Sequence, residues 1–149
     1  MLETLNLNKY NAGKVKRTII KRWIRQRSIR GFSDVDVWNL DGFLLKLIPD
    51  AIKRLAEISH GWPQSEKFPT FESWEKFLKD LSSDFRRAQS LIYFEDSDES
   101  YELLKKCNSS MKSFKEDYVP TIEEKRECGT KLLKDCFNRL SDNITNLWD

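Results

Sequence analysis

The chain has 149 residues, with 26 basic and 24 acidic side chains, a formal net charge of +2 and five tryptophans. A chain of this length with 39% hydrophobic residues is expected to form one soluble domain whose core needs neither disulfides nor metals. No apolar run approaches the roughly 18 residues of a membrane span, and we expect no secretion signal. Three cysteines without a close pair favour reduced thiols and a cytoplasmic location.

The charge is unevenly distributed along the chain. Residues 1–33 hold nine basic side chains against Glu3 alone, a local charge of +8, whereas the remaining residues sum to −6. A chain with this asymmetry can hold its basic arm against its own acidic body, or it can offer that arm to an anionic partner.

Residues 1–13 lack periodicity and are expected to be loosely ordered. From 14 to 30 the pattern changes, because Val15, Ile19 and Trp23 form a narrow apolar stripe and basic residues cover the rest. This pattern predicts a basic amphipathic helix. Such a helix can lie on anionic membranes or nucleic acid, or it can simply be an N-terminal helix with a solvated basic face.

The stretch 31–63 is the one around which the chain is organised. Ser33 is expected to cap a helix start, and Asp34 and Asp36 to oppose the positive end of that helix. Apolar residues then follow at steps of three and four. They are Val37, Leu40, Phe43, Leu44, Leu47, Ile48, Ala51, Ile52, Leu55 and Ile58. Pro49 interrupts the stripe, so we expect a kink there, or a stop and restart of the helix.

Three further helices are predicted after the proline-containing linker. Thr70 caps a helix whose apolar residues repeat at helical spacing to about residue 92. A thinner stripe predicts another helix over 101–118. Thr121 and Glu124 form a capping-box pair ahead of the last helix, which runs to the C-terminus.

These elements predict an all-α fold, since no alternating stretch is long enough for a strand. We expect a single domain over 1–149, a bundle of about five helices with a proline-interrupted helix at its centre. Gly129 within the last helix either weakens it or allows a neighbouring helix to approach closely.

The sequence is poor in catalytic motifs. It has no glycine-rich phosphate loop, no nucleophile elbow and no paired-histidine motif, and one histidine with three scattered cysteines cannot build a zinc site. Asp34, Asp36 and Asp41 could hold Mg²⁺, but helix capping by the first two and pairing of Asp41 with a nearby basic residue are favoured. We therefore expect a non-enzymatic protein without metal or cofactor.

The aromatic residues and the single histidine offer the clearest candidates for binding. Trp38 and Trp74 fall on or beside apolar stripes and are expected in the core. Trp23 and Trp62 lie near the basic helix and the proline linker, where they could stack on a base or fasten those segments onto the bundle. His60 is interpreted either as a terminal residue interacting with the last helix carbonyls or as a ligand contact beside Trp62.

Several motifs resemble a group of small helical proteins encoded by tailed phages and prophages of gut bacteria. The likeness extends from about Lys14 to Asp149. It is carried by the WNLD motif at 38–41, the IP pair at 48–49, the HGWP motif at 60–63, Trp74, and the LWD motif at 147–149. The resemblance implies a viral origin and a place of action in the host cytosol, and it carries over no catalytic residue.

These observations lead to the hypothesis of a phage accessory protein that sequesters an anionic ligand, such as a nucleotide signal of host antiviral defence. The guanidinium group suits phosphate because its planar fork donates two parallel hydrogen bonds. The candidate ligand-binding residues are Arg22, Trp23, Arg25, Arg27, Arg30, His60 and Trp62. The alternatives are a protein-interaction module that binds or inhibits a host or virion protein, and a nucleic-acid-binding protein. Assembly into a homo-oligomer is a further alternative.

Overall fold

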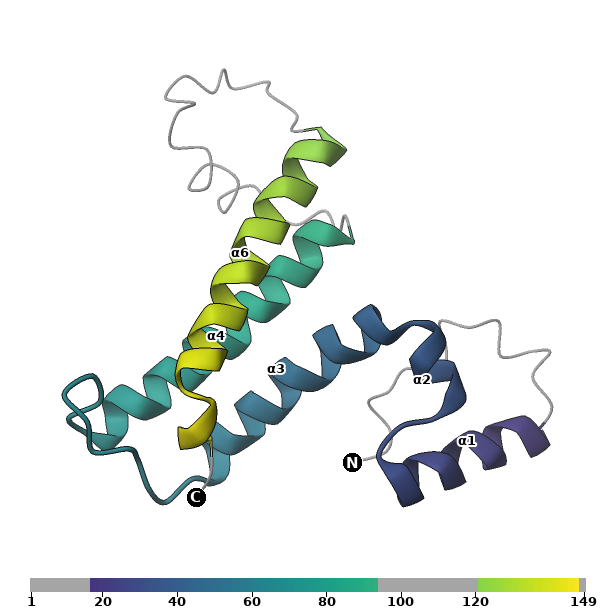
Figure 1. Ribbon diagram of the computed structural model, residues 1–149, viewed down its shortest axis with the longest axis horizontal. Helices are drawn as coiled ribbons and strands as arrows, with labels where there is room; N and C mark the ends of the chain where they lie inside the picture. Colours follow the sequence, from purple (N-terminus) through teal and green to yellow (C-terminus); the bar gives the residue numbers. More distant parts are fainter. Residues whose placement is uncertain (1–16, 94–120, 148–149) are drawn as a thin grey trace. The chain divides into compact units, whose positions relative to one another are not determined.

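The computed structural model describes residues 17–93 and 121–147 (Figure 1). These residues contain five α-helices and no β-strand, apart from an isolated β-bridge between Ser65 and Phe68. The elements are α1 Arg17–Arg30, α2 Asp34–Trp38, α3 Leu40–Ile58, α4 Phe71–Ile92, α6 Ile122–Asp142 and the 3₁₀ helix η2 Ile144–Asn146. The all-α prediction is confirmed for this part of the chain. The expected loose segment 1–13 and the helix over 101–118 lie outside the described residues.

The chain divides into two units, Met1–Phe43 and Leu44–Asp149, and each is described by itself. The single domain expected over 1–149 stays a prediction. In the first unit, the basic helix α1 ends at a glycine with a left-handed backbone, Gly31 at φ +81°, whose N–H donates to the Arg27 carbonyl at 2.9 Å. Glycine adopts this conformation without the steric penalty of a side chain. The turn is therefore short, and Ser33 caps α2 two residues later.

The break in the central helix lies at Asn39 and not at Pro49. Of the two alternatives expected at Pro49, a kink or a stop and restart, the stop and restart does not occur, because α3 runs through Pro49 to Ile58. Leu45 and Ile52, about one turn before and after the proline, are both buried in the core. Their packing offsets the missing backbone hydrogen bond. The Pro49 carbonyl also accepts a hydrogen bond from Ser82 Oγ of α4 at 2.8 Å.

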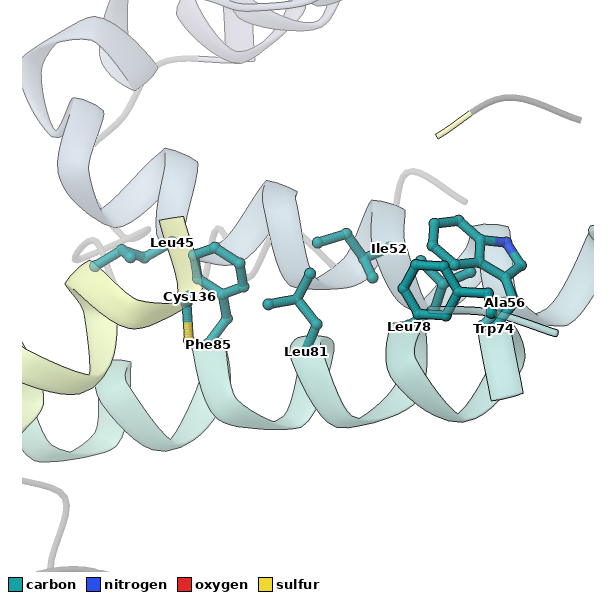
Figure 2. Packing of buried hydrophobic residues seen from close by; sticks show 9 residues of the cluster. Leu45, Ile52, Ala56, Trp74, Leu78, Leu81, Phe85 and Cys136 are labelled. Atoms are coloured by element: carbon teal, nitrogen blue, oxygen red, sulfur yellow. The ribbon is translucent and has the colours of Figure 1, made fainter. Parts of the chain in front are cut away.

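The second unit is built around a main hydrophobic core, to which α3, α4, α6 and the linker contribute (Figure 2). Its buried residues are Leu45, Ile52, Ala56, Phe68, Trp74, Leu78, Leu81, Phe85 and Cys136. Helix α4 supplies four of them at steps of four, three and four, so the sequence prediction of this helix and of a buried Trp74 is confirmed. Trp74 also meets the Phe68 ring edge-on, with centroids 4.8 Å apart.

The helix caps predicted at Thr70 and Thr121 are present, as is the one at Ser33. The Thr70 hydroxyl accepts from the Ser73 N–H at 3.3 Å at the start of α4. At the start of α6, the Thr121 hydroxyl accepts from the Glu124 N–H at 3.2 Å, and the Glu124 carboxylate accepts from the Thr121 N–H at 2.8 Å. Each cap satisfies backbone donors that a helix leaves without an internal partner.

The cysteines follow the sequence interpretation only in part. Cys136 is free and fully buried, and burial raises the pKa of its thiol to about 11 against the opposing effect of the Arg139 guanidinium. It is therefore protonated at neutral pH and acts as a small apolar core residue. Cys128 is disulfide-bonded, so the expectation that all three thiols are reduced is wrong at this position.

Gly129 marks a close contact between α4 and α6. A Cβ atom at this position would lie 2.9 Å from Ile92 Cγ1, 3.0 Å from Leu91 Cβ and 3.1 Å from the Ala88 carbonyl oxygen. Of the two sequence-based interpretations, close approach of a neighbouring helix is confirmed.

We predict that Gly129→Ala lowers the free energy of unfolding by about 1 kcal/mol. The helix propensity of alanine favours the variant by about 1 kcal/mol, but crowding against the α4 backbone is unfavourable by about 1–3 kcal/mol. Urea unfolding measures the difference, and Thr130→Ala at the exposed neighbouring position controls for propensity and is expected to be neutral or slightly stabilising. A gain in stability for Gly129→Ala would show that α4 yields to the added methyl group.

Candidate functional site

A largely buried ion pair, with Asp36 buried and Arg27 partly buried, joins α1 to α2. Arg27 Nε donates to Asp36 Oδ2 at 2.8 Å, and an Arg27 terminal nitrogen donates to Asp36 Oδ1 at 2.5 Å. The exposed fractions of the two side chains are 13% and 6%. The Ser33 N–H and hydroxyl each donate to Asp36 Oδ2 at 2.7 Å, so four hydrogen bonds converge on one carboxylate.

The two charges of this pair stabilise one another. Burial acts to raise the pKa of Asp36, but the hydrogen bonds from Arg27 and Ser33 outweigh it and hold that pKa below its usual range. The hydrogen bond with Asp36 in turn raises the pKa of Arg27. Both groups are therefore charged at neutral pH.

Asp34 gathers three more side chains of α1 at the surface. It accepts from Gln26 Nε2 at 2.7 Å, from Arg22 at 3.1 Å and from Arg30. The Asp34 N–H donates back to Gln26 Oε1 at 3.0 Å. The hydrogen bond from Gln26, followed by that from Arg30, lowers the pKa of Asp34.

These contacts change the interpretation of the candidate arginines. The sequence prediction assigned Arg22, Arg27 and Arg30 to an anionic ligand, whereas the structure pairs all three with Asp34 or Asp36. Arg25 is exposed and has no carboxylate partner in the described residues, and Trp23 is half-buried on the same helix. A phosphate reaching the paired arginines would compete with two carboxylates already in place.

His60 and Trp62 lie in the second unit, after the end of α3. His60 is exposed. At the end of α3, the Leu55 carbonyl accepts hydrogen bonds from the N–H and from the hydroxyl of Ser59. Trp62 packs against the main core and meets the Phe71 ring edge-on with centroids 6.3 Å apart. Trp62 therefore fastens the linker to its own unit, as one of the two interpretations of this residue predicted.

The sequence interpretation missed the most exposed aromatic side chain among residues 17–43. Trp38 was expected in the core, but 90% of its surface is exposed, and Val37 and Leu40 are 51% and 48% exposed. The core assignment of Trp38 is wrong because α2 ends at this residue and the apolar stripe of α3 begins beyond it. We call Val37, Trp38 and Leu40 the Trp38 surface.

Asn39 is the signal that could have revealed this break. Asparagine is favoured at the residue preceding a helix, and an acidic residue is favoured in the first helical turn, where Asp41 lies. The Asn39 carbonyl accepts from the Phe43 N–H at 2.9 Å, the first such bond of α3. The apolar periodicity continues across this position and so gives no sign of a helix start, whereas Asn39 and Asp41 do indicate one.

Metal binding has no support among the described residues, where no group of three histidine, cysteine or acidic side chains could hold an ion. The oxygens of Asp34 and Asp36 accept hydrogen bonds from guanidinium groups instead. Of the helices in the described ranges, none has the length and apolar character needed to cross a membrane.

Comparison with known proteins gives no match, whether with family models, curated proteins or solved structures. The resemblance to small tailed-phage proteins therefore stays a prediction. The contacts and exposure of the described residues are the basis for any functional assignment.

We predict that Asp36→Asn destabilises the α1–α2 pair by about 1–3 kcal/mol, because it leaves the partly buried Arg27 charge without its counter-ion. Amide hydrogen exchange of residues 17–38 measures the loss of protection. Asp34→Asn removes a more exposed carboxylate and is expected to have the smaller effect. Equal protection in the wild type and Asp36→Asn would show that the pair does not hold the helices.

The lowered pKa of Asp36 also predicts a pH dependence. A carboxyl group whose folded pKa is depressed stabilises the fold fully above its unfolded pKa of about 4, and loses that effect as the pH falls through the folded value. Hydrogen-exchange protection of α1 and α2, corrected for intrinsic rates, should therefore stay constant from pH 7 to 5 and fall below pH 4 (about the unfolded pKa). A decline between pH 7 and 5 would contradict this assignment.

Proposed function

We propose that this chain is a non-enzymatic protein-binding module whose anchor is the Trp38 surface. The observation that carries the proposal is the 90% exposure of Trp38, a residue type that dominates the energetics of protein interfaces. A tryptophan buries about 150–250 Å² when it enters a pocket. An indole left in water by its own fold is available to a partner.

The neighbours of Trp38 support this proposal. Single exposed apolar residues are normal on protein surfaces, but here three large ones occur within four positions. They lie where α2 meets α3, and α2 is held by the capping box of Ser33 and Asp36 and by the Arg27 pair. A rigid support reduces the entropy lost when such an anchor binds.

Charge indicates the kind of partner. Residues 17–43 contain six basic and three acidic side chains, so this part of the unit is cationic. An interface of complementary potential would be acidic. We therefore propose a partner protein with an apolar pocket bordered by carboxylates, in the host cytosol.

Sequestration of a compact anionic ligand, such as a nucleotide signal, is the weaker proposal. Three of its four candidate arginines already donate to Asp34 or Asp36. Binding a phosphate there would require these hydrogen bonds to be broken or shared. The protein-binding proposal needs no existing contact to change.

We predict that Trp38→Ala reduces partner affinity at least about 30-fold, as expected for an interface hot spot, and changes the unfolding free energy by less than about 0.5 kcal/mol. Crosslinking in expressing bacterial cells followed by mass spectrometry identifies the partner, and titration calorimetry with the purified partner measures the affinity. Ile122→Ala, at a 61% exposed site on α6, is the matched control.

The control variant should bind like the wild type. Retention of full affinity by Trp38→Ala would remove the proposal. A loss of more than about 2 kcal/mol in stability would show that Trp38 supports the fold instead.

A further inference from the structure

Three basic residues follow one line along the outside of α1. Arg17, Lys21 and Arg25 are four positions apart, which places them on the same helical face, and all three are exposed. Helix α1 contains no acidic residue, and no carboxylate of the described residues forms an ion pair with any of the three. We call them the outer basic row.

The outer basic row differs from the inner arginines of the same helix. Arg27 and Arg30 pair with carboxylates at α2 and so help to fold the unit. The outer basic row forms no ion pair with a carboxylate of the described residues. Like charges four residues apart destabilise a helix by about 0.2–0.5 kcal/mol per pair. The fold therefore gains nothing from this arrangement of charge.

We propose that the outer basic row binds the phosphate backbone of a nucleic acid. Successive members are about 6 Å apart along the helix axis, a separation comparable to that of neighbouring phosphates on one strand. Arginine donates to phosphate in a bidentate manner and lysine contributes a point charge. Thr18 is exposed beside the row and offers a hydroxyl donor. Such contacts position a protein on nucleic acid without reading its sequence.

The apolar residues of α1 argue against a membrane surface as the partner. A helix that lies on a membrane presents one broad apolar face to the lipid. The exposed isoleucines of α1 are Ile19, Ile24 and Ile29. A spacing of five residues turns each one by about 140° from the last, so they do not form a common face.

The sequence before α1 adds to the local positive charge. Lys9, Lys14 and Lys16 precede the helix, against Glu3 alone. Each phosphate neutralised contributes about 0.7 to 0.9 to the slope of log affinity against log salt. If each of the three residues of the row neutralises one phosphate, together they contribute about 2–3 to that slope.

Fluorescence anisotropy of the full chain with a short labelled DNA strand and its duplex tests the proposal over a series of salt concentrations. Arg17→Gln, Lys21→Gln and Arg25→Gln combined should weaken binding at least about 10-fold at low salt and reduce the slope by about 2–3. The control combines Lys53→Gln, Lys76→Gln and Lys134→Gln, which remove the same charge from exposed sites of the second unit. It should retain most of the affinity.

Circular dichroism and the hydrogen-exchange protection of α1 establish that the row variant remains folded. Equal binding by the row variant and the control, or no binding by the wild type at low salt, would overturn the proposal. So would equal competition by polyglutamate or anionic vesicles at matched charge, which would assign the row to the acidic partner proposed for the Trp38 surface or to a lipid surface. Trp38→Ala should bind nucleic acid normally, which separates this outcome from that of the protein-binding proposal.

Discussion

The ion pair between Arg27 and the buried Asp36 is the interaction on which the first unit depends. Among residues 17–43, the buried side chains are Ser33 and Asp36, and no apolar residue there is fully buried. A helix of 14 residues is marginal in water unless it packs against something. Hydrogen bonds and charge, and not an apolar core, therefore hold α1 against α2.

The second unit is held by a different force. Helix α4 buries seven residues along its length, and the three largest fully buried core residues, Trp74, Phe85 and Leu78, all belong to it. Apolar burial of this kind varies little with pH and is strengthened by many salts. The ion-paired helices of the first unit respond to pH through two carboxylates, and only their exposed pairs are strongly screened by salt. The same chain thus combines two kinds of stabilisation.

Local signals predicted much of the described part of the second unit. The caps at Thr70 and Thr121 and the apolar repeat of α4 follow from residues near one another in the sequence. Gly129 left two interpretations open, and the structure selects the close approach of α4. The arginine pairs did not follow, because they form across a turn whose geometry depends on the left-handed backbone of Gly31. Charge counting shows that α1 is basic, but not which of its arginines meet a carboxylate.

The prediction that Trp38 is buried was wrong for a related reason. Its apolar character fits the period of the next helix, so periodicity alone places it in the core, and only the chemistry of Asn39 contradicts that placement. Assignment by residue type therefore made two opposite errors: it gave a binding role to a residue of the fold, and it placed an exposed residue in the core. Arg27 is part of the fold, and Trp38 is left outside it.

The size of the Trp38 surface sets what a partner must supply. Burial of about 150–250 Å² of indole at about 25 cal/mol per Å² contributes roughly 4–6 kcal/mol before any entropy is lost. Association itself costs about 4–15 kcal/mol, so one tryptophan leaves little or no net affinity. Val37 and Leu40 must contribute, and so must the positive charge of the first unit. An uncharged apolar pocket would therefore hold this protein weakly, whereas an acidic one gains long-range attraction from the cationic helix while the indole supplies the contact.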